Sequence, residues 1–115
     1  KMHELGIVLH FIDKVEEVAK KNGAEKVVSA TLEVGEVSTI VPEYFKDCYD
    51  WAIKKTEYMK ECKLNLVVVS ALSYCKDCDE TYETTKYGKK CPHCGSYNTY
   101  LISGDQVFIR DLKVV

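Results

Sequence analysis

Four of the six cysteines form two pairs of the type C-x2-C. Cys75 and Cys78 make the first pair, Cys91 and Cys94 make the second, and twelve residues separate the pairs. Each pair places two thiolates on one side of a tight turn, so two facing pairs build a tetrahedral cage of four sulfur atoms. Gly95 supplies the conformational freedom that such a turn needs. We therefore predict a structural zinc ion bound by these four cysteines.

Two alternatives use the same residues. Paired disulfides would suit an oxidising compartment, and a cage of four thiolates also binds iron. An iron site would make the protein an electron carrier and would absorb visible light, whereas a zinc site would not. A zinc ion with four cysteine ligands has no open position for water, so we expect it to be structural and not catalytic.

Length and composition limit the class of protein. The chain has 115 residues, of which 46% are hydrophobic, which suffices for one domain that carries a smaller module. No apolar run reaches the length of a membrane span, and no signal peptide precedes the first helix-like segment. Cys48 and Cys62 have no C-x2-C partner. These features predict a cytoplasmic protein without a membrane partner.

The charge distribution argues against binding to nucleic acid. The net charge is −2 and the pI is about 5.9, whereas such proteins carry a clustered basic face. Between residues 70 and 100 the lysines are balanced by carboxylates. A nucleic-acid- or protein-binding zinc ribbon is the alternative function, since tyrosines could stack on bases. No pair of carboxylates or nucleophile–base set is recognisable, so we expect no enzymatic activity.

Hydrophobic periodicity predicts an α+β fold. An amphipathic helix is expected over residues 4–21, with Leu5, Val8, Leu9, Ile12, Val15 and Ala19 on its apolar stripe. A strand over 26–34 follows, in which Val28, Ala30, Leu32 and Val34 face the core. A second helix opens at Pro42, and Phe45, Cys48, Tyr49, Ala52 and Met59 form its apolar face. Two further strands are expected, over residues 63–70 and over residues 106–114. We expect the strand over 63–70 to be the most buried one.

This order predicts a three-stranded mixed sheet with two helices on one face. A zinc-ribbon-like module with two C-x2-C knuckles is inserted between the second and third strands. We expect residues 1–70 and 102–115 to form one domain and residues 71–101 to form the zinc-binding module.

A second metal-binding feature lies at the amino terminus, which reads Lys1-Met2-His3-Glu4. An α-amine, backbone amide nitrogens and the His3 imidazole can lie in one plane around a metal ion. Such a set of nitrogen ligands selects Ni(II) or Cu(II) over zinc, and Glu4 can add an oxygen. The alternative is that His3 is a solvated residue ahead of a helix.

The sequence resembles the HypA (HybF) family, the nickel chaperones of [NiFe]-hydrogenase maturation. The resembling segments are MHEL at residues 2–5, GEVS at 35–38, VPE at 41–43, the two cysteine pairs with CPHCGS at 91–96, and Gly104 before the final strand. Together they run through almost the whole chain in order.

The resemblance implies a nickel metallochaperone with nickel bound at His3, Glu4 and Met2 and zinc at the four cysteines. It further implies delivery to the hydrogenase large subunit together with a HypB-like GTPase, and some family members also serve urease and its accessory proteins. The chain contains no G-x-x-x-x-G-K loop, so nucleotide hydrolysis would belong to the partner. We expect a monomer or a weak homodimer.

The sequence leaves the roles of three residues near these sites undecided. Family members begin at the methionine, whereas Lys1 precedes it here and either extends the chelate or derives from an upstream tag. His10 lies two helical turns from His3, about 10 Å away, which is too far for one nickel ion. His93, inside the second knuckle, is either a rim residue or an exchanging ligand.

Overall fold

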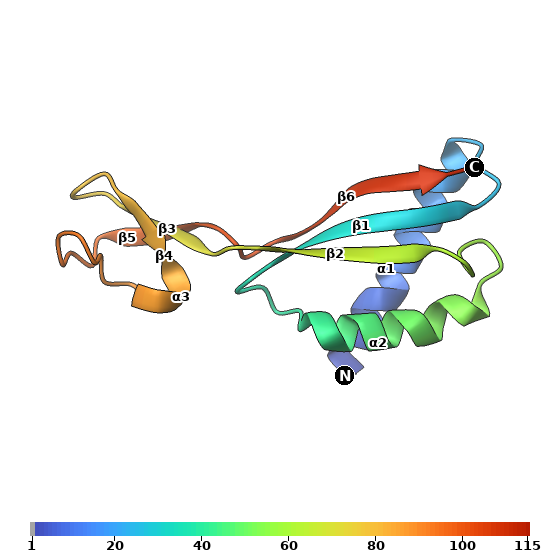
Figure 1. Ribbon diagram of the computed structural model, residues 1–115, viewed down its shortest axis with the longest axis horizontal. Coiled ribbons are helices and arrows are strands. Elements are labelled where there is room, and N and C mark those ends of the chain that lie inside the picture. The colour runs from blue at the N-terminus through green and yellow to red at the C-terminus, as the bar shows by residue number, and fades with distance from the viewer. Residues whose placement is uncertain (1) are drawn as a thin grey trace. The chain divides into compact units, whose positions relative to one another are not determined.

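The computed structural model describes residues 2–115 (Figure 1). Its elements are α1 (Met2–Lys21), β1 (Val27–Gly35), α2 (Pro42–Ala52), a 3-10 turn (Ile53–Lys55), β2 (Lys63–Val69), β3 (Leu72–Cys75), β4 (Thr81–Glu83), α3 (Thr84–Tyr87), β5 (Thr99–Ser103) and β6 (Val107–Val114). No helix among the described residues combines the length and apolar character that a membrane span requires.

The chain divides into two compact units. We call one the core unit; it comprises residues up to Leu32, Ile40–Val67 and Phe108–Val115. We call the other the cysteine unit; it comprises Glu33–Thr39 and Val68–Val107. The long strands β1, β2 and β6 each have residues in both units.

The first sheet has the strand order β2-β1-β6. Just after the end of β6, the Val115 N–H donates to the Lys26 carbonyl, which precedes β1 (3.1 Å). Just before the start of β6, the Gln106 carbonyl accepts from the N–H of Gly35, the last residue of β1 (2.8 Å), so β1 and β6 are antiparallel. The Glu36 N–H donates to the Val69 carbonyl (2.8 Å), which places the ends of β1 and β2 together. The predicted mixed sheet of three strands is confirmed.

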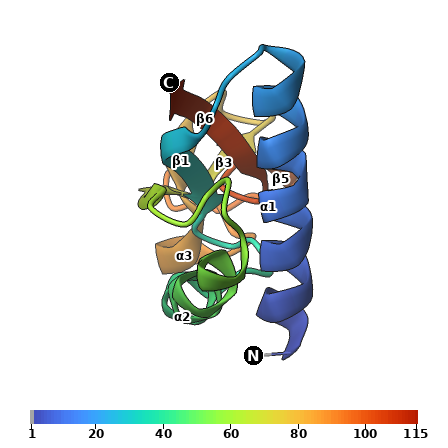
Figure 2. The same cartoon turned by 90° about the vertical axis from the view of Figure 1, so that its right-hand side faces the viewer.

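Helices α1 and α2 cross on one face of this sheet (Figure 2). Helix α1 buries Val8, Phe11, Ile12, Val15 and Ala19. The Phe11 ring meets the rings of Phe45 and Tyr49 of α2, at centroid distances of 5.7 Å and 6.2 Å. The Tyr49 hydroxyl donates to the Cys62 carbonyl (2.8 Å), so its buried polar atom is satisfied.

Some predicted burial patterns were wrong. Leu9 is 46% exposed while Phe11 is buried, because a stripe through positions 8, 11, 12, 15 and 19 leaves position 9 at its margin. Val28 is exposed and Val27 is buried at the start of β1. Strand β2 is not the most buried strand: only Leu64 is fully buried in it, since β2 lies at the sheet edge and β1 at the centre.

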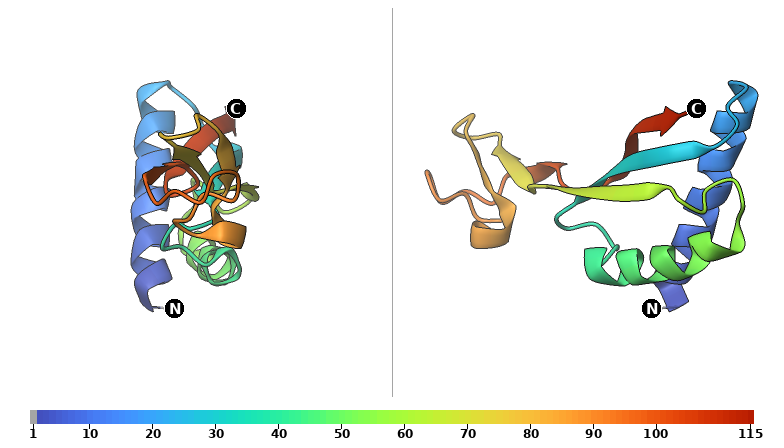
Figure 3. Two further views of the ribbon diagram at one scale, coloured as in Figure 1. Left: turned by 90° about the vertical axis from the view of Figure 1, so that its left-hand side faces the viewer. Right: turned by 45° about the vertical axis from the view of Figure 1, so that its right-hand side comes forward.

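The cysteine unit contains a second, antiparallel sheet with the order β4-β3-β5 (Figure 3). Two glycines allow its chain segments to approach closely. A Cβ atom on Gly104, whose φ is +95°, would lie 2.4 Å from the Ala71 Cα atom. A Cβ atom on Gly35 would lie 2.1 Å from the Gly104 carbonyl oxygen. Any larger side chain at either position would force the backbones apart.

Candidate metal centre

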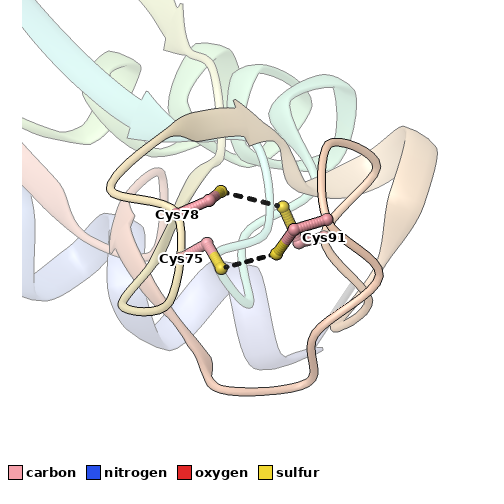
Figure 4. A group of neighbouring side chains, drawn as sticks. Cys75, Cys78 and Cys91 are labelled. Atoms are coloured by element: carbon pink, nitrogen blue, oxygen red, sulfur yellow. Dashed lines mark hydrogen bonds between the residues drawn. The ribbon is translucent and has the colours of Figure 1, made fainter.

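The four paired cysteines converge within the cysteine unit. Cys75 ends β3 and begins the first knuckle, and the second knuckle, Cys91 to Cys94, follows α3. All four sulfur atoms lie within 4.8 Å of one another. The Sγ atoms of Cys75 and Cys94 are 3.6 Å apart, as are those of Cys78 and Cys91. Figure 4 shows the side chains of Cys75, Cys78 and Cys91 pointing into one common space.

These separations fit one metal ion. Four sulfur atoms at about 2.3 Å from a tetrahedral ion lie about 3.8 Å from one another, close to the observed spacing. A disulfide requires about 2.05 Å, and all six cysteines are free. The sulfur atoms therefore form a preshaped tetrahedral site, and the disulfide alternative is excluded in this structure.

The two knuckles share one backbone pattern. In the first, the Cys75 N–H donates to the Glu80 carbonyl and the Asp79 N–H donates to the Cys75 carbonyl, both at 2.9 Å. In the second, the N–H groups of Cys91 and Gly95 make the equivalent bonds, to Ser96 and Cys91, also at 2.9 Å. The fourth residue after the first cysteine has positive φ in both: Asp79 at 62° and Gly95 at 78°. Aspartate tolerates this conformation better than most residues.

Backbone N–H groups also point at the sulfur atoms. The His93 N–H lies 3.4 Å from the Cys91 sulfur. Burial raises the pKa of the Cys91 thiol, but hydrogen bonds from the N–H groups of Cys94 and His93 outweigh it and bring the pKa to about 6. Burial and a hydrogen bond to Cys91 raise the pKa of Cys78 to about 12. A metal ion must therefore displace protons when it binds, so acid weakens binding.

A carboxylate connects the two knuckles. Asp77 accepts hydrogen bonds from the Ser96 hydroxyl and from Nδ2 of Asn98 (3.1 Å). The Asn98 N–H in turn donates to the Ser96 hydroxyl oxygen (2.9 Å). The bonds from Ser96 and Asn98 lower the pKa of Asp77, so the carboxylate stays ionised at neutral pH. Asp77 thus fixes the spacing of the two cysteine pairs from outside the sulfur cage.

The histidines lie outside this cage. His93 is exposed and contacts it through its backbone N–H. His10 is exposed on α1. Among the described residues, the four cysteines are the only group of histidine, cysteine or acidic side chains with the spacing of a metal site.

The predicted nickel ligands begin α1, which starts at Met2. His3 is exposed, whereas Glu4 is 4% exposed. Lys1 and the Met2 side chain lie outside the part of the chain that the structure describes. The structure therefore presents the His3 imidazole to solvent but turns the Glu4 carboxylate inward.

The Glu4 carboxylate interacts with the start of α2. Its Oε2 atom accepts a hydrogen bond from the Val41 N–H (3.4 Å), next to Pro42, the first residue of α2. Val41 makes no side-chain cap of its own, so Glu4 supplies a carboxylate from another helix at this positive helix end. Burial raises the pKa of Glu4, but hydrogen bonds from the backbone N–H groups of Val41 and of Glu4 itself outweigh it and lower the pKa.

Comparison with known families identifies the family of this chain. The family model for HypA, described as "Hydrogenase/urease nickel incorporation, metallochaperone, hypA", matches residues 2–114. The chain belongs to the HypA family. The predicted family resemblance is confirmed.

Similar proteins match nearly the whole length of this chain. A hydrogenase maturation factor HypA of Actinobacillus succinogenes is 33% identical over 113 residues, which are 98% of this chain and 99% of that protein. A factor of the same name from Aeromonas salmonicida is 34% identical with the same coverage. The Ni metallochaperone HypA from Helicobacter pylori, solved in solution, has a TM-score of 0.71 and 25% identity and covers 97% of each chain.

Sequence reasoning missed three features of the site. No role was predicted for Asp77 or Asp79, yet Asp77 joins the knuckles and Asp79 holds the left-handed turn. Asp79 occupies the position that matches Gly95, and this alignment of the two knuckles could have revealed it. The burial of Glu4 depends on a residue 37 positions away, for which the local sequence carries no signal.

Replacing Cys91 by alanine should abolish metal binding at the cage. Three sulfur ligands hold an ion less tightly, and the small cysteine unit depends on it for folding. We expect elemental analysis to find less than one ion per chain and NMR to find collapsed amide dispersion for β3–β5, with α1 and α2 intact. The control Cys48→Ala, outside the cage, should keep the ion. Full metal retention in Cys91→Ala would contradict the assignment.

Replacing Asp77 by alanine should speed the loss of the metal without changing its ligands. The Ser96 and Asn98 bonds disappear, so the two knuckles separate more readily. We expect the release rate to a coloured chelator to rise severalfold. Glu80→Ala removes a neighbouring exposed carboxylate and serves as the matched control. Equal rates for both variants would show that the cross-knuckle contacts do not hold the cage.

Replacing Glu4 by glutamine should reveal a pH-dependent contribution to stability. The folded-state pKa of Glu4 is lowered from its ordinary value of 4.5, so the carboxylate stabilises the fold above that pH and less as pH falls below it. In nickel-free denaturation, the parent should exceed Glu4→Gln in stability near pH 7, and the difference should shrink below pH 4.5. Glu43→Gln, exposed on the first turn of α2, is the control. A pH-independent difference would contradict the charge-based role.

Proposed function

We propose that this chain binds Ni(II) at its amino terminus and delivers it during the maturation of a hydrogenase, or of urease. Its membership of a nickel metallochaperone family supports this function. The observation that carries the site is the exposed His3 imidazole on the first turn of α1. Nickel is the cargo of this process and not a resident cofactor.

The start of a helix suits nitrogen coordination. The first four backbone N–H groups of a helix have no acceptor within it, so main-chain nitrogens beside His3 can coordinate a metal without breaking helical bonds. Together with the imidazole they form the nitrogen set that Ni(II) prefers over zinc. Met2 contributes main-chain nitrogen in this arrangement.

Glu4 has a conditional role in this proposal. Its carboxylate is buried and its Oε2 atom accepts a hydrogen bond from Val41, so nickel would compete with this contact for the carboxylate. Nickel binding through Glu4 would then remove an interaction between α1 and the start of α2. We propose that His3 and main-chain nitrogens bind nickel first and that Glu4 follows.

The four cysteines would hold Zn(II) as a structural ion. The sulfur spacing fits a tetrahedral ion with four thiolate ligands, which zinc prefers and which leaves no open position for water. A HypB-like GTPase and the hydrogenase large subunit are the proposed partners. Chemistry on nucleotides would lie with the GTPase, because the sequence contains no phosphate-binding loop.

Replacing His3 by alanine should remove nickel binding and leave the cage ion unchanged. The imidazole is a direct ligand, so nickel affinity measured by calorimetry should fall roughly a hundredfold or more. His10→Ala, an exposed histidine on the same helix, is the matched control and should bind nickel like the parent. Acidification should weaken binding in the parent, because protons compete for the nitrogen ligands.

Two outcomes would count against this site. An unchanged nickel isotherm in His3→Ala would place the site elsewhere. Loss of both metals in His3→Ala would show that His3 acts through folding. The titration needs protein whose chain begins at Met2, so that no tag residue alters the terminal amine.

A further inference from the structure

One edge of the cysteine unit's sheet is open. The Cys75 N–H donates to the Glu80 carbonyl on the β4 side of β3. The next N–H, that of Lys76, donates to the Asn98 carbonyl on the β5 side (3.0 Å), so N–H groups at this end of β3 point alternately to the two neighbouring strands. Tyr74 pairs with Tyr100 and Cys75 with Thr99 in this register. In an antiparallel ladder, the N–H and C=O groups of Thr99 therefore point away from β3, as do those of Leu101, which forms the last pair before the register shifts between Ser73 and Leu72.

This edge lacks the features that usually prevent strand addition. Edge strands are commonly protected by charged residues, proline or shortness. The five residues of β5, Thr-Tyr-Leu-Ile-Ser, contain neither a charge nor a proline. Three of them are well exposed: Tyr100 at 49%, Leu101 at 37% and Ile102 at 47%. The opposite edge, β4, has only three residues.

A groove lies over one face of the sheet, next to β5. It has a volume of about 450 Å³ and is lined by Ser73, Thr99 and Leu101 of the sheet and by Lys89 and Tyr97. Leu101 and Ser73 are cross-strand partners and so share one face of the sheet. Ser73 is buried and its hydroxyl pairs with that of Thr84 (2.7 Å), which fixes the floor of the groove. An extended chain bound along β5 would place alternate side chains here.

The only charge in the lining of the groove is positive. Lys89 is the only charged residue in its lining, and no ion pair of its side chain is found among the described residues. The nearby Lys86 is already paired with Glu83 (2.8 Å). A second copy of β5 would bring no charge to pair with Lys89, whereas an acidic segment of another protein would.

We propose that β5 and this groove bind an extended, acidic segment of a partner protein by strand addition. The main chain of the segment bonds to the outward groups of Thr99 and Leu101. One of its apolar side chains packs on Leu101, and a carboxylate on the same face pairs with Lys89. This docking surface uses neither the four cysteines nor the residues proposed to bind nickel, so it can fail while the nickel function stands.

The test uses two blocked peptides, Thr-Val-Thr-Val-Thr-Glu-Thr and the same peptide with lysine in place of glutamate. Their apolar and charged residues lie on one face of an extended chain. In NMR titrations of the metal-loaded protein at millimolar peptide, the glutamate peptide should shift the Thr99 and Leu101 amides and slow their hydrogen exchange. The lysine peptide should bind about fivefold more weakly, as expected for one cross-strand charge pair.

Variants separate the backbone contribution from that of the charge. Leu101→Pro removes an N–H that points away from β3, so the sheet can persist while peptide binding is lost. Leu101→Ala keeps this N–H and should keep binding within a few fold. Lys89→Glu, at an exposed position, should reverse the preference between the peptides. Cage metal content and β3 amide shifts report that each variant is folded.

Several results would overturn the proposal. One is that neither peptide binds the parent, and another is that the glutamate peptide binds Leu101→Pro with the affinity of the parent. Equal affinity for the two peptides, in the parent and in Lys89→Glu, would also contradict it. Concentration-dependent protection of Thr99 and Leu101 without peptide would identify a second copy of this chain as the occupant and would also overturn it. Lys89 is exposed and meets β5 through its main-chain carbonyl, which accepts a hydrogen bond from the Thr99 hydroxyl (2.6 Å). Because Lys89→Glu keeps this carbonyl, it decides the question even if Leu101→Pro unfolds.

Discussion

The convergence of four sulfur atoms is the constraint on which the cysteine unit depends. Its buried apolar cluster consists of Tyr82 and two of the cysteines themselves, Cys75 and Cys91. So small a cluster cannot offset the entropy of ordering the surrounding loops. A metal ion at the centre of the thiols can, because its binding energy becomes folding energy. The ion would thus serve this unit as a core.

The core unit is stabilised in a different way, because its two helices and its central strand bury aromatic and aliphatic side chains. This difference explains which parts of the fold could be predicted from sequence. Helical and strand periodicity located α1, β1 and α2 because burial on one face imposes a repeat. The run of apolar residues in β2 failed as a guide to burial, because position in the sheet depends on the partners of a strand and not on its own composition.

Cysteine spacing indicated the cage because knuckle geometry is local and needs only a few residues. The contacts that hold the two knuckles together were not predictable in the same way. Asp77 meets Asn98 across 21 positions, and the turn that brings them together exists only after both knuckles have formed. Asp79 is an intermediate case, because its left-handed conformation follows from comparing the first knuckle with the second. Local rules therefore identify candidate ligands, whereas the residues that orient them emerge from tertiary structure.

The open edge of β5 is connected to the same cage. Strand β3 ends at Cys75 of the sulfur cage, and the next residue, Lys76, continues the ladder to Asn98, whose side chain bonds to Asp77. The backbone geometry that aims Thr99 and Leu101 outward is thus set by a ladder that ends within the knuckles. Loosening the sulfur cage would release the end of this ladder before its middle, as sheet ends have fewest neighbouring bonds. A docking surface on β5 would then be ordered only while the cage is closed, which would link metal occupancy to partner binding through one continuous set of hydrogen bonds.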